Sequence, residues 1–504
     1  MKDFILRHEE RIHRALEILP GFVSWNLILF PYWGIFVFPV VVAYFVLLFD
    51  VYWFYQSLTI AITASVAHIR IEASKRFSWE EDIKSFPDWE KVQHIIIIPT
   101  YKEPLHIIER TIGSLAKQTL PLGQLHVVLA MEKKEDETER KIKIKALQKE
   151  FGEKGGNSPS GRFGSFLVTV HELAPGEVVG KASNERYAVL ATKKEIIKRH
   201  RMDIRYLTVT SCDADHSFHP KHFAYLTYKF LDEPDRYYKI WQPAMLFYQN
   251  IWRLPAITRV LNSISSIWNL SQLPRKDRLI NAQNYSLSFW LLDHVGYWDP
   301  DVIPEDYHIF FKAFYKTRGR VEVEAIYLPV FANAPEGENT WRTIRSQYFQ
   351  YQRWAWGVSD DPYVIKNYFL TPNVPFLSKT FRLVNLMREH FLWPVNWFVI
   401  TIGLSIPVLL NPTFSRTVLG YSLPGLSSLI LTFALGFLLI MFIIHLKQSP
   451  PRPKTFPVWR TILLPLEFVL MPIAGFLFGA LPGLDAHTRL MLGKYMEYRV
   501  TEKI

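Results

Sequence analysis

Residues 206–220 read YLTVTSCDADHSFHP, and this stretch decides the fold. Its first half is apolar and β-branched, which favours a buried strand, and its second half is polar and carries Asp213 and Asp215 one residue apart. In open α/β sheets, ligands bind beyond the carboxyl ends of the strands. Two carboxylates there offer the oxygen ligands that Mg2+ and Mn2+ prefer. We therefore predict a strand that ends in a metal site held by Asp213 and Asp215. His216 is either a further ligand or, as we expect, a neutral loop histidine.

Three further apolar stretches lie upstream, at residues 94–99, 125–130 and 166–171, and each is short and rich in β-branched side chains. A charged helical pattern over residues 133–150 follows the second of them. The Gly- and Ser-rich stretch at 152–164 then predicts a mobile loop. Strands that alternate with helical stretches are typical of an α/β domain with a largely parallel sheet.

The two ends of the chain have a different composition. Between Gly21 and Ala67 the only charged residue is Asp50, and the stretch is about twice the roughly 20 residues that cross a bilayer. It therefore predicts two transmembrane helices with a tight turn between them. In the C-terminal part, residues 390–410 and 424–445 predict two firm spans.

A third apolar segment, at residues 461–484, contains Glu467 and two prolines. It either crosses the membrane or forms a broken re-entrant hairpin, and the basic tail that follows favours the hairpin. The predicted order is a cytoplasmic N-terminal segment (1–20), two transmembrane helices (21–67), an α/β domain with interfacial helices (68–386), C-terminal transmembrane helices (387–484) and a basic tail (485–504).

The distribution of charge predicts how the chain is oriented. The 504 residues include 58 Lys and Arg against 47 Asp and Glu, a formal net charge of +11. The basic residues collect beside the apolar stretches, so we expect a lipid bilayer and no nucleic acid as a partner. The loop at 447–460 has basic residues and no acid, which predicts a cytoplasmic loop. Two N-terminal spans then return the α/β domain to the cytoplasmic face of the cell membrane, where the single cysteine, Cys212, stays reduced.

Two further motifs carry chemistry. In YWDPDVIPEDYHIF (297–310), Glu305 and Asp306 open a helical segment, where they either complement the helix dipole or supply a general base. In QYFQYQRWAWG (347–357), Arg353 suits a diphosphate and Trp354 suits stacking on a sugar. The alternative for this second motif is an interfacial helix with a snorkelling arginine and an anchoring tryptophan.

The order of these motifs resembles that of the processive members of glycosyltransferase family 2, the cellulose synthase and hyaluronan synthase-like enzymes. Their pattern is D, D-x-D, T-E-D and Q-x-x-R-W, and here the last three read Asp213-Ala-Asp215, Pro304-Glu305-Asp306 and Gln350-Tyr-Gln-Arg353-Trp354. The resemblance covers about residues 93–357. Two positions depart from the pattern: Glu132 stands for the first aspartate and Pro304 for the threonine.

The resemblance implies a GT-A-type catalytic domain, with a Rossmann-like mixed sheet, between transmembrane helices. It further implies that Asp213 and Asp215 hold Mg2+ or Mn2+ and that Asp306, beside Glu305, deprotonates the acceptor. The implied contacts with the nucleotide and donor are Thr100, Tyr101, Glu103, Glu132, Lys181, Asn184 and Arg353. The implied contacts with the acceptor are Gln350, Trp354, Trp298 and Asn284.

The expected function is inverting transfer of a sugar from a nucleotide-sugar donor, a UDP-sugar first, to a growing polysaccharide whose translocation is coupled to synthesis. Two alternatives stay open. The chain transfers one sugar to a polyprenyl phosphate or another lipid acceptor, or it is an inactive scaffold or export subunit. Expected partners are the donor, a glycan or lipid-linked acceptor, the bilayer, and accessory secretion subunits formed by other chains.

Overall fold

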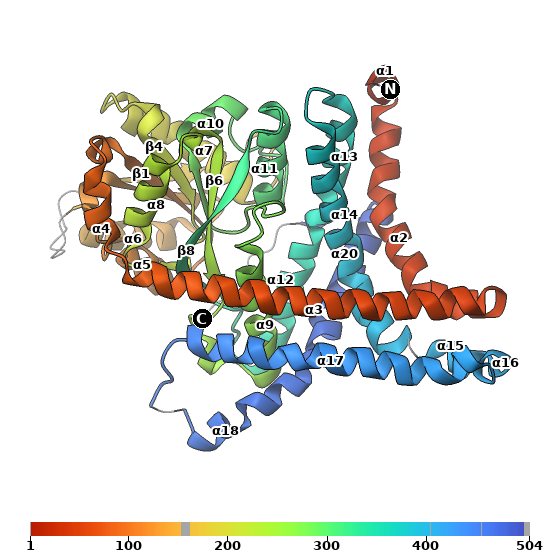
Figure 1. Cartoon of the computed structure of the whole chain (residues 1–504). Coiled ribbons are helices and arrows are strands. Elements are labelled where there is room, and N and C mark those ends of the chain that lie inside the picture. The colour runs from red at the N-terminus through yellow and green to blue at the C-terminus, as the bar shows by residue number, and fades with distance from the viewer. Residues whose placement is uncertain (1, 153–161, 404, 455, 498–504) are drawn as a thin grey trace.

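The computed structural model describes residues 2–152, 162–403, 405–454 and 456–497. A central α/β domain stands beside long helices from both ends of the chain (Figure 1). Most of the loop predicted at 152–164 lies outside the described residues.

The core of the central domain is one mixed sheet of eight strands in the order β3-β2-β1-β4-β7-β6-β8-β5. Strands β1 to β4 are mutually parallel, and the four strands predicted from the sequence are confirmed there. Parallel strands are covered by helices on both faces and so read as continuous apolar runs, and Ile95, Ile96, Ile97 and Ile98 of β1 are all fully buried. The strands are β1 (Gln93–Thr100), β2 (Leu125–Glu132), β3 (Ser165–His171), β4 (Leu207–Ser211), β5 (Ser217–Phe218), β6 (Lys239–Leu246), β7 (Tyr285–Ser288) and β8 (Glu322–Phe331).

Helices pack on both sides of this sheet (Figure 1). The charged helix predicted after β2 is α6, which starts where the side chain of Asp136 accepts hydrogen bonds from the backbone N–H groups of Thr138 and Glu139. The helices are α4 (Trp79–Asp82), α5 (Leu105–Leu115), α6 (Glu137–Phe151), α7 (Lys181–Thr192), α8 (His222–Asp232), α9 (Ala256–Gln272), α10 (Phe289–Val295), α11 (Glu305–Lys316), α12 (Thr340–Ala355) and α13 (Asp361–Leu370).

One strand pairing positions the residues that the sequence analysis singled out. Strand β7 runs antiparallel to β4, with Tyr285 opposite Ser211. Because β4 leads out into the Asp213–Asp215 turn and β7 is entered from residues 281–284, these two loops meet at one edge of the sheet. Residues that are about seventy positions apart in the sequence therefore share one site.

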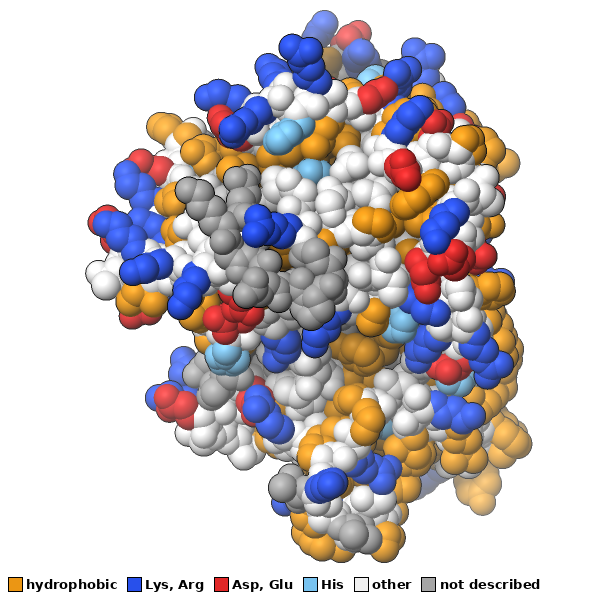
Figure 2. Space-filling view, turned by 90° about the vertical axis from the view of Figure 1, so that its left-hand side faces the viewer, with side chains coloured by type: hydrophobic (Ala, Val, Ile, Leu, Met, Phe, Trp, Pro, Cys, Tyr) orange, Lys and Arg blue, Asp and Glu red, His pale blue; other side chains and the backbone are white. Residues whose placement is uncertain are grey.

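Among the described residues, four helices are long and apolar enough to cross a membrane: α2 (Glu9–Val37), α3 (Pro39–Arg76), α17 (Val418–Gln448) and the run Trp459–Met491. This suggests a multi-pass membrane protein. Their exposed side chains include Phe36, Leu48 and Leu439. In Figure 2, by contrast, charged side chains are spread over the face of the central domain, and hydrophobic side chains crowd its right-hand edge.

Helices α3 and α17 lie side by side (Figure 1). Asp50, the lone charge of the first apolar stretch, is fully buried in α3 and accepts a hydrogen bond from Ser427 of α17. Buried charged groups need such partners. At its other end, α3 reaches the central domain, where Arg70 donates to the Tyr327 hydroxyl of β8 at 2.7 Å.

The C-terminal helices differ in detail from the predicted segments. The segment at 390–410 falls on the second half of α14 (Phe376–Phe398), a π-helical turn (Val399–Gly403) and α15 (Ile406–Leu410). It is not among the four long helices of the described residues, and its role as a span stays a prediction. A short α16 (Pro412–Ser415) leads into α17, and a single-turn α1 (Lys2–Arg7) precedes α2.

The last apolar segment does not form a hairpin. In the described residues it is one continuous helical run through α18 (Val458–Glu467), α19 (Met471–Ala474) and α20 (Leu481–Met491). Its first part packs on α9 and its last part on α12 and α2. Glu467, the charge that suggested a break, lies 3.2 Å from the Arg259 guanidinium of α9. This ion pair explains how a continuous helix carries the acid.

A close approach between two C-terminal helices gives a stability prediction. A Cβ atom on Gly475 would lie 2.1 Å from the ring of Trp397 in α14, so Gly475→Ala forces the helices apart. Overpacking of this kind costs about 1–3 kcal/mol. We expect a lower thermal unfolding midpoint for Gly475→Ala in detergent. The control is Gly436→Ala in α17, whose added Cβ meets no atom within 4 Å. Equal midpoints for the two variants would contradict this packing.

Candidate active site

The end of β4 supplies a group of metal-ligating side chains. Ligand atoms of Asp213, Asp215 and His216 all lie within 4.8 Å of one another. Asp215 is buried and accepts a hydrogen bond from the backbone N–H of Asn333 at 3.0 Å, while Asp213 is half-buried. Two carboxylates and one imidazole are a donor set that suits Mn2+ or Mg2+.

His216 lies closer to this group than the sequence analysis expected. Its ring is buried, with Nε2 3.8 Å from an Asp213 carboxylate oxygen and Nδ1 3.3 Å from the side-chain amide of Asn284. The pairing of β7 with β4 places Asn284 beside this histidine, and the sequence pattern does not predict that long-range contact.

Lys181, at the start of α7, connects the acidic groups. Its ammonium lies 2.9 Å from Asp213, 3.1 Å from Glu305 and 3.9 Å from Glu185, and it donates to the backbone carbonyl of Gln283 at 2.7 Å. Burial would lower the pKa of Lys181, but these carboxylates outweigh burial and hold that pKa well above its ordinary value. The lysine therefore stays charged in the middle of the site.

The carboxylates outnumber the lysine. Glu185 is fully buried and accepts a hydrogen bond from the Ser211 hydroxyl at 2.6 Å. Burial raises the pKa of Glu185 and of Glu305, and Lys181 offsets only part of that rise. The sequence analysis missed Glu185, although it follows Lys181 by four residues and so lies on the same face of the helix.

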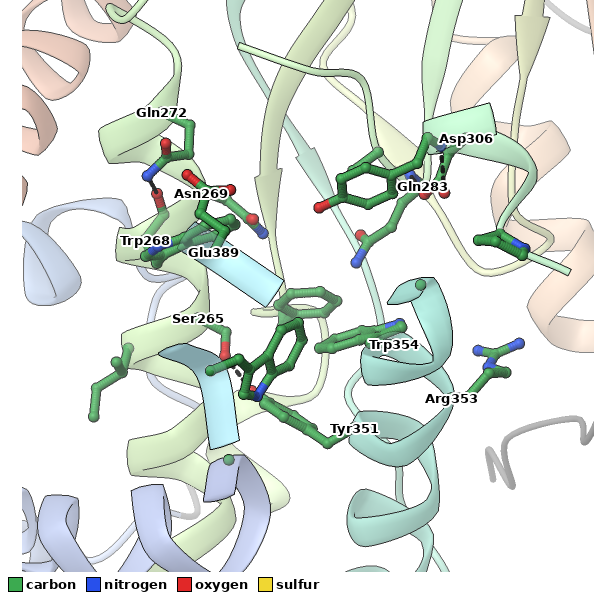
Figure 3. A pocket seen from close by; sticks show the side chains of 18 of the residues that line it. Ser265, Trp268, Asn269, Gln272, Gln283, Asp306, Tyr351, Arg353, Trp354 and Glu389 are labelled. Atoms are coloured by element: carbon green, nitrogen blue, oxygen red, sulfur yellow. Dashed lines mark hydrogen bonds between the residues drawn. The ribbon is translucent and has the colours of Figure 1, made fainter. Parts of the chain in front are cut away.

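Asp306 is held by backbone groups. Its carboxylate accepts hydrogen bonds from the N–H of Gln283 at 3.0 Å and of Tyr307 at 2.9 Å, and Figure 3 draws the pair with Gln283. Burial raises the pKa of Asp306 and these hydrogen bonds limit the rise. Gln283 adopts a left-handed φ of 59°, which is uncommon for a residue with a side chain and is maintained here by its bonds to Asp306 and Lys181. A carboxylate fixed in this way is suited to accept a proton.

The residues predicted to bind the donor line one cavity with these carboxylates. Glu103 accepts hydrogen bonds from the Thr100 hydroxyl at 2.8 Å and from the Tyr101 N–H at 2.5 Å, which shapes the loop after β1. Asn184 donates to the carbonyl of Ala130 at 2.9 Å, and its buried side-chain oxygen has no partner in the part of the chain that the structure describes. Burial raises the pKa of Glu132, whose carboxylate lies 3.6 Å from the His171 ring. The residues that share the cavity are Thr100, Tyr101, Glu103, Glu132, Lys181, Asn184, Asp213, Asp215, Glu305, Asp306, Arg353 and Trp354.

This cavity has a volume of about 490 Å3 and continues from the carboxylates to the long helices. Its middle is lined by aromatic rings, including Tyr351 and Trp354 of α12, which pack with ring centroids 4.8 Å apart. Figure 3 shows Asp306 and Gln283 on one side of the cavity and Trp268, Asn269 and Gln272 of α9 on the other. At its far end the lining comes from α17 and the last helical run, through Ala434, Leu438, Met441, Gly475 and Gly479.

Three of the four residues predicted to contact an acceptor, Trp298, Gln350 and Asn284, do not line the cavity within the described residues. Trp298 is fully buried and its indole N–H donates to the Tyr285 hydroxyl at 2.7 Å. Gln350 accepts from Gln347 at 3.1 Å, which in turn accepts from Asn262 at 2.8 Å, so this amide chain fastens α12 to α9. Asn284 is buried beside His216.

A charged network ties the start of α11 to the segment that follows α12. His308, two residues after Asp306, lies between Asp299 at 2.9 Å and Asp360 at 2.7 Å, and Lys312 pairs with Asp299 at 2.6 Å. Burial would lower the pKa of His308, but the carboxylates of Asp360 and Asp299 outweigh it and raise the pKa to about 9. This imidazolium holds the helix of Asp306 against the segment Trp356–Asp360, which follows α12.

The network predicts a pH dependence of stability. The pKa of His308 rises from its ordinary 6.5 to about 9 on folding, so its contribution is complete below pH 6.5 and is lost as pH rises through 9. His308→Gln should lower the free energy of unfolding by about 3 kcal/mol near neutral pH, because it leaves Asp360 buried without its cation. The difference from the wild-type protein should shrink above pH 9 when both are measured by chemical denaturation.

The control for this prediction is His106→Gln, which changes an exposed histidine of α5. It should follow the wild-type stability at every pH. If the free energy of unfolding of His308→Gln also changed with pH in parallel with that of the wild-type protein, the charge of His308 would not contribute to stability.

Three comparisons with known proteins bear on the site. The family model described as "Glycosyl transferase family group 2" matches residues 208–444, from β4 into α17. A search of curated proteins gives no match. Among solved structures, the chain is similar to the mannosyltransferase PcManGT from Pyrobaculum calidifontis in complex with GDP-Man and Mn2+. The identity is 14%, the TM-score 0.39, and the match covers 78% of this chain and 99% of that one. It is also similar to residues 1–349 of S. aureus TarS in complex with UDP-GlcNAc, with 15% identity, a TM-score of 0.37 and coverage of 72% and 93%.

Proposed function

We propose that this chain, which contains a glycosyltransferase family 2 domain of the GT-A type, transfers a sugar with inversion from a nucleotide-sugar donor to an acceptor that arrives from the membrane side. One observation carries the proposal. A single cavity joins the metal-ligating carboxylates and Asp306 to the aromatic rings of α12 and to the long apolar helices. The donor to test first is a UDP-sugar, and the acceptor to test first is a growing polysaccharide.

The chemistry assigned to the chain follows from the positions of its side chains. A divalent cation on Asp213 and Asp215 would neutralise charge on the departing diphosphate. The acceptor hydroxyl oxygen forms the new bond to the anomeric carbon while the bond from that carbon to the diphosphate oxygen breaks. Asp306 accepts the hydroxyl proton, and its raised pKa favours that role. Arg353 suits the leaving diphosphate, because a guanidinium can donate two parallel hydrogen bonds to it.

Processive synthesis is favoured by the aromatic lining of the cavity. Sugar rings stack on aromatic faces, and Trp354, Trp393 and Trp397 all line the cavity between the carboxylates and the long helices. A growing glycan would leave along these rings, so synthesis and translocation would be coupled. The central domain then lies in the cytoplasm at the cell membrane, and accessory secretion subunits would be other chains.

A single transfer to a lipid acceptor is the second candidate. It is favoured by the apolar end of the same cavity, where Ala434, Leu438 and Met441 of α17 could contact a hydrocarbon chain.

The test uses the full-length protein in nanodiscs with a panel of nucleotide sugars. We expect release of nucleoside diphosphate from one donor, dependent on Mg2+ or Mn2+, and a ladder of product lengths. Asp306→Asn should lower turnover by about 100-fold to 10,000-fold, because it removes the proton acceptor. Asp215→Asn should weaken metal binding as well as turnover.

Asp301→Asn is the matched control, because Asp301 is an exposed carboxylate on the same segment and does not line the cavity. It should leave turnover unchanged. One added sugar on a lipid would select the second candidate, and no release from any donor by folded protein would contradict both.

A further inference from the structure

The cavity has a second polar wall, opposite Asp306. Figure 3 shows Gln272 and Asn269 of α9 and Glu389 of α14 on the side of the cavity away from Asp306. Arg275, just beyond the end of α9, and Arg388 of α14 line the same cavity. The reaction proposed above assigns no role to these two arginines.

Both guanidinium groups keep donors free for a ligand. Arg275 is half-buried, and within the described ranges no acceptor receives a hydrogen bond from its side chain. Arg388 donates from Nη2 to Glu389 at 3.0 Å, while its buried Nε has no hydrogen-bond partner among the described residues. An arginine has five N–H donors in a fixed fork, so each of these side chains has unused capacity.

The charge at this wall is positive. Arg275, Arg388 and Glu389 all lie within electrostatic reach of the Tyr52 hydroxyl on α3, which accepts a hydrogen bond from Gln56 at 2.7 Å. One carboxylate stands against two guanidinium groups there. The neighbouring Arg278 is already occupied, because it pairs with Asp277 at 3.1 Å and lies over the ring of Phe381. The surplus of one positive charge, in a part of the cavity with aromatic and amide walls, favours an anion.

The surroundings indicate how such an anion would arrive. Tyr52, Trp53 and Trp268 line this region, and tyrosine and tryptophan are enriched where a protein meets the headgroup level of a membrane. The apolar side chains of α17, Leu438 and Met441, line the same cavity and offer room for a hydrocarbon chain. A phosphate attached to a lipid satisfies both features, because its charge meets the arginines and its tail meets α17.

We propose that Arg275 and Arg388 bind the phosphate of a lipid-linked saccharide, which is the acceptor. This inference rests on the proposed transfer reaction and favours a lipid-linked acceptor over a free polysaccharide. Glu389, which accepts a hydrogen bond from Arg388, lies on the side of the cavity away from Asp306 (Figure 3), so we place the phosphate on that side. A sugar carried by the phosphate spans the cavity past Trp354, and its hydroxyl reaches Asp306. The hydroxyl oxygen bonds to the anomeric carbon, Asp306 takes the proton, and the nucleoside diphosphate departs from the donor.

The test measures binding and does not depend on turnover. Full-length protein in detergent is titrated with a polyprenyl phosphate and with the polyprenol of the same chain length, and bound lipid is counted by native mass spectrometry. We expect the phosphate to bind about tenfold or more tightly than the alcohol, because two charge-assisted contacts are lost in the alcohol. Equal affinities would overturn the proposal with the wild-type protein alone.

Variants locate the site. The double change Arg275→Gln with Arg388→Gln should remove the preference for the phosphate while the alcohol still binds, which also shows that the protein is folded. Arg278→Gln, a change in an arginine that does not line the cavity, should keep the preference. Preference kept by the double variant, or lost equally in Arg278→Gln, would contradict the assignment.

Two further arms separate the alternatives. Inorganic diphosphate that binds as tightly as the lipid and displaces it would assign the arginines to a soluble anion and overturn the lipid-linked acceptor. Asp306→Asn should bind the polyprenyl phosphate as the wild-type protein does. If the wild-type protein binds the polyprenyl phosphate normally but shows no turnover, the proposed transfer reaction is contradicted and the phosphate site is not.

Discussion

The structure depends on one electrostatic constraint, the imbalance between a single lysine and the carboxylates around it. Lys181 pairs with Asp213 and Glu305, and Glu185 lies 3.9 Å away. One ammonium cannot neutralise all three of these carboxylates, and burial makes the remaining negative charge costly. A divalent cation held by Asp213 and Asp215 would relieve that cost and would offer positive charge to a diphosphate. The fold has to keep four separate segments together for this balance to exist.

The mixed sheet and the helices beside it hold these four segments together. The antiparallel pairing of β7 with β4 brings Gln283 to Asp306 and to Lys181, whose ammonium contacts Asp213. The His308 network then joins the helix of Asp306 to the segment after α12, and the amide chain through Gln347 joins α12 to α9. Because α9 also packs on α3, these contacts connect the helix of Asp306 to the long apolar helices. The cavity is the space that these connected elements enclose.

The sequence alone predicted the features that depend on a local residue pattern. The buried runs of β1 and β2 and the carboxylates after β4 could be read from composition and from the place of a strand end. Which side chains are buried, line the cavity or form ion pairs depends on long-range packing. Nothing local distinguishes Trp298, which the core buries, from Trp354, which the cavity exposes, and the role of Glu185 appears only once α7 is placed against β4. Glu467 suggested a broken segment because its partner, Arg259, lies some two hundred residues away.

We propose that the acceptor occupies the half of the cavity between the long apolar helices, while the donor occupies the half beside the carboxylates. Ala434→Trp tests it most directly, because Ala434 of α17 lines the membrane half and a large side chain would fill it. Leu435→Trp, at the exposed neighbouring position, is the control. Metal-dependent hydrolysis of the donor and transfer to the acceptor would be measured side by side. The account predicts that Ala434→Trp keeps hydrolysis and loses transfer, while Leu435→Trp keeps both. Transfer at the wild-type rate by folded Ala434→Trp would contradict it.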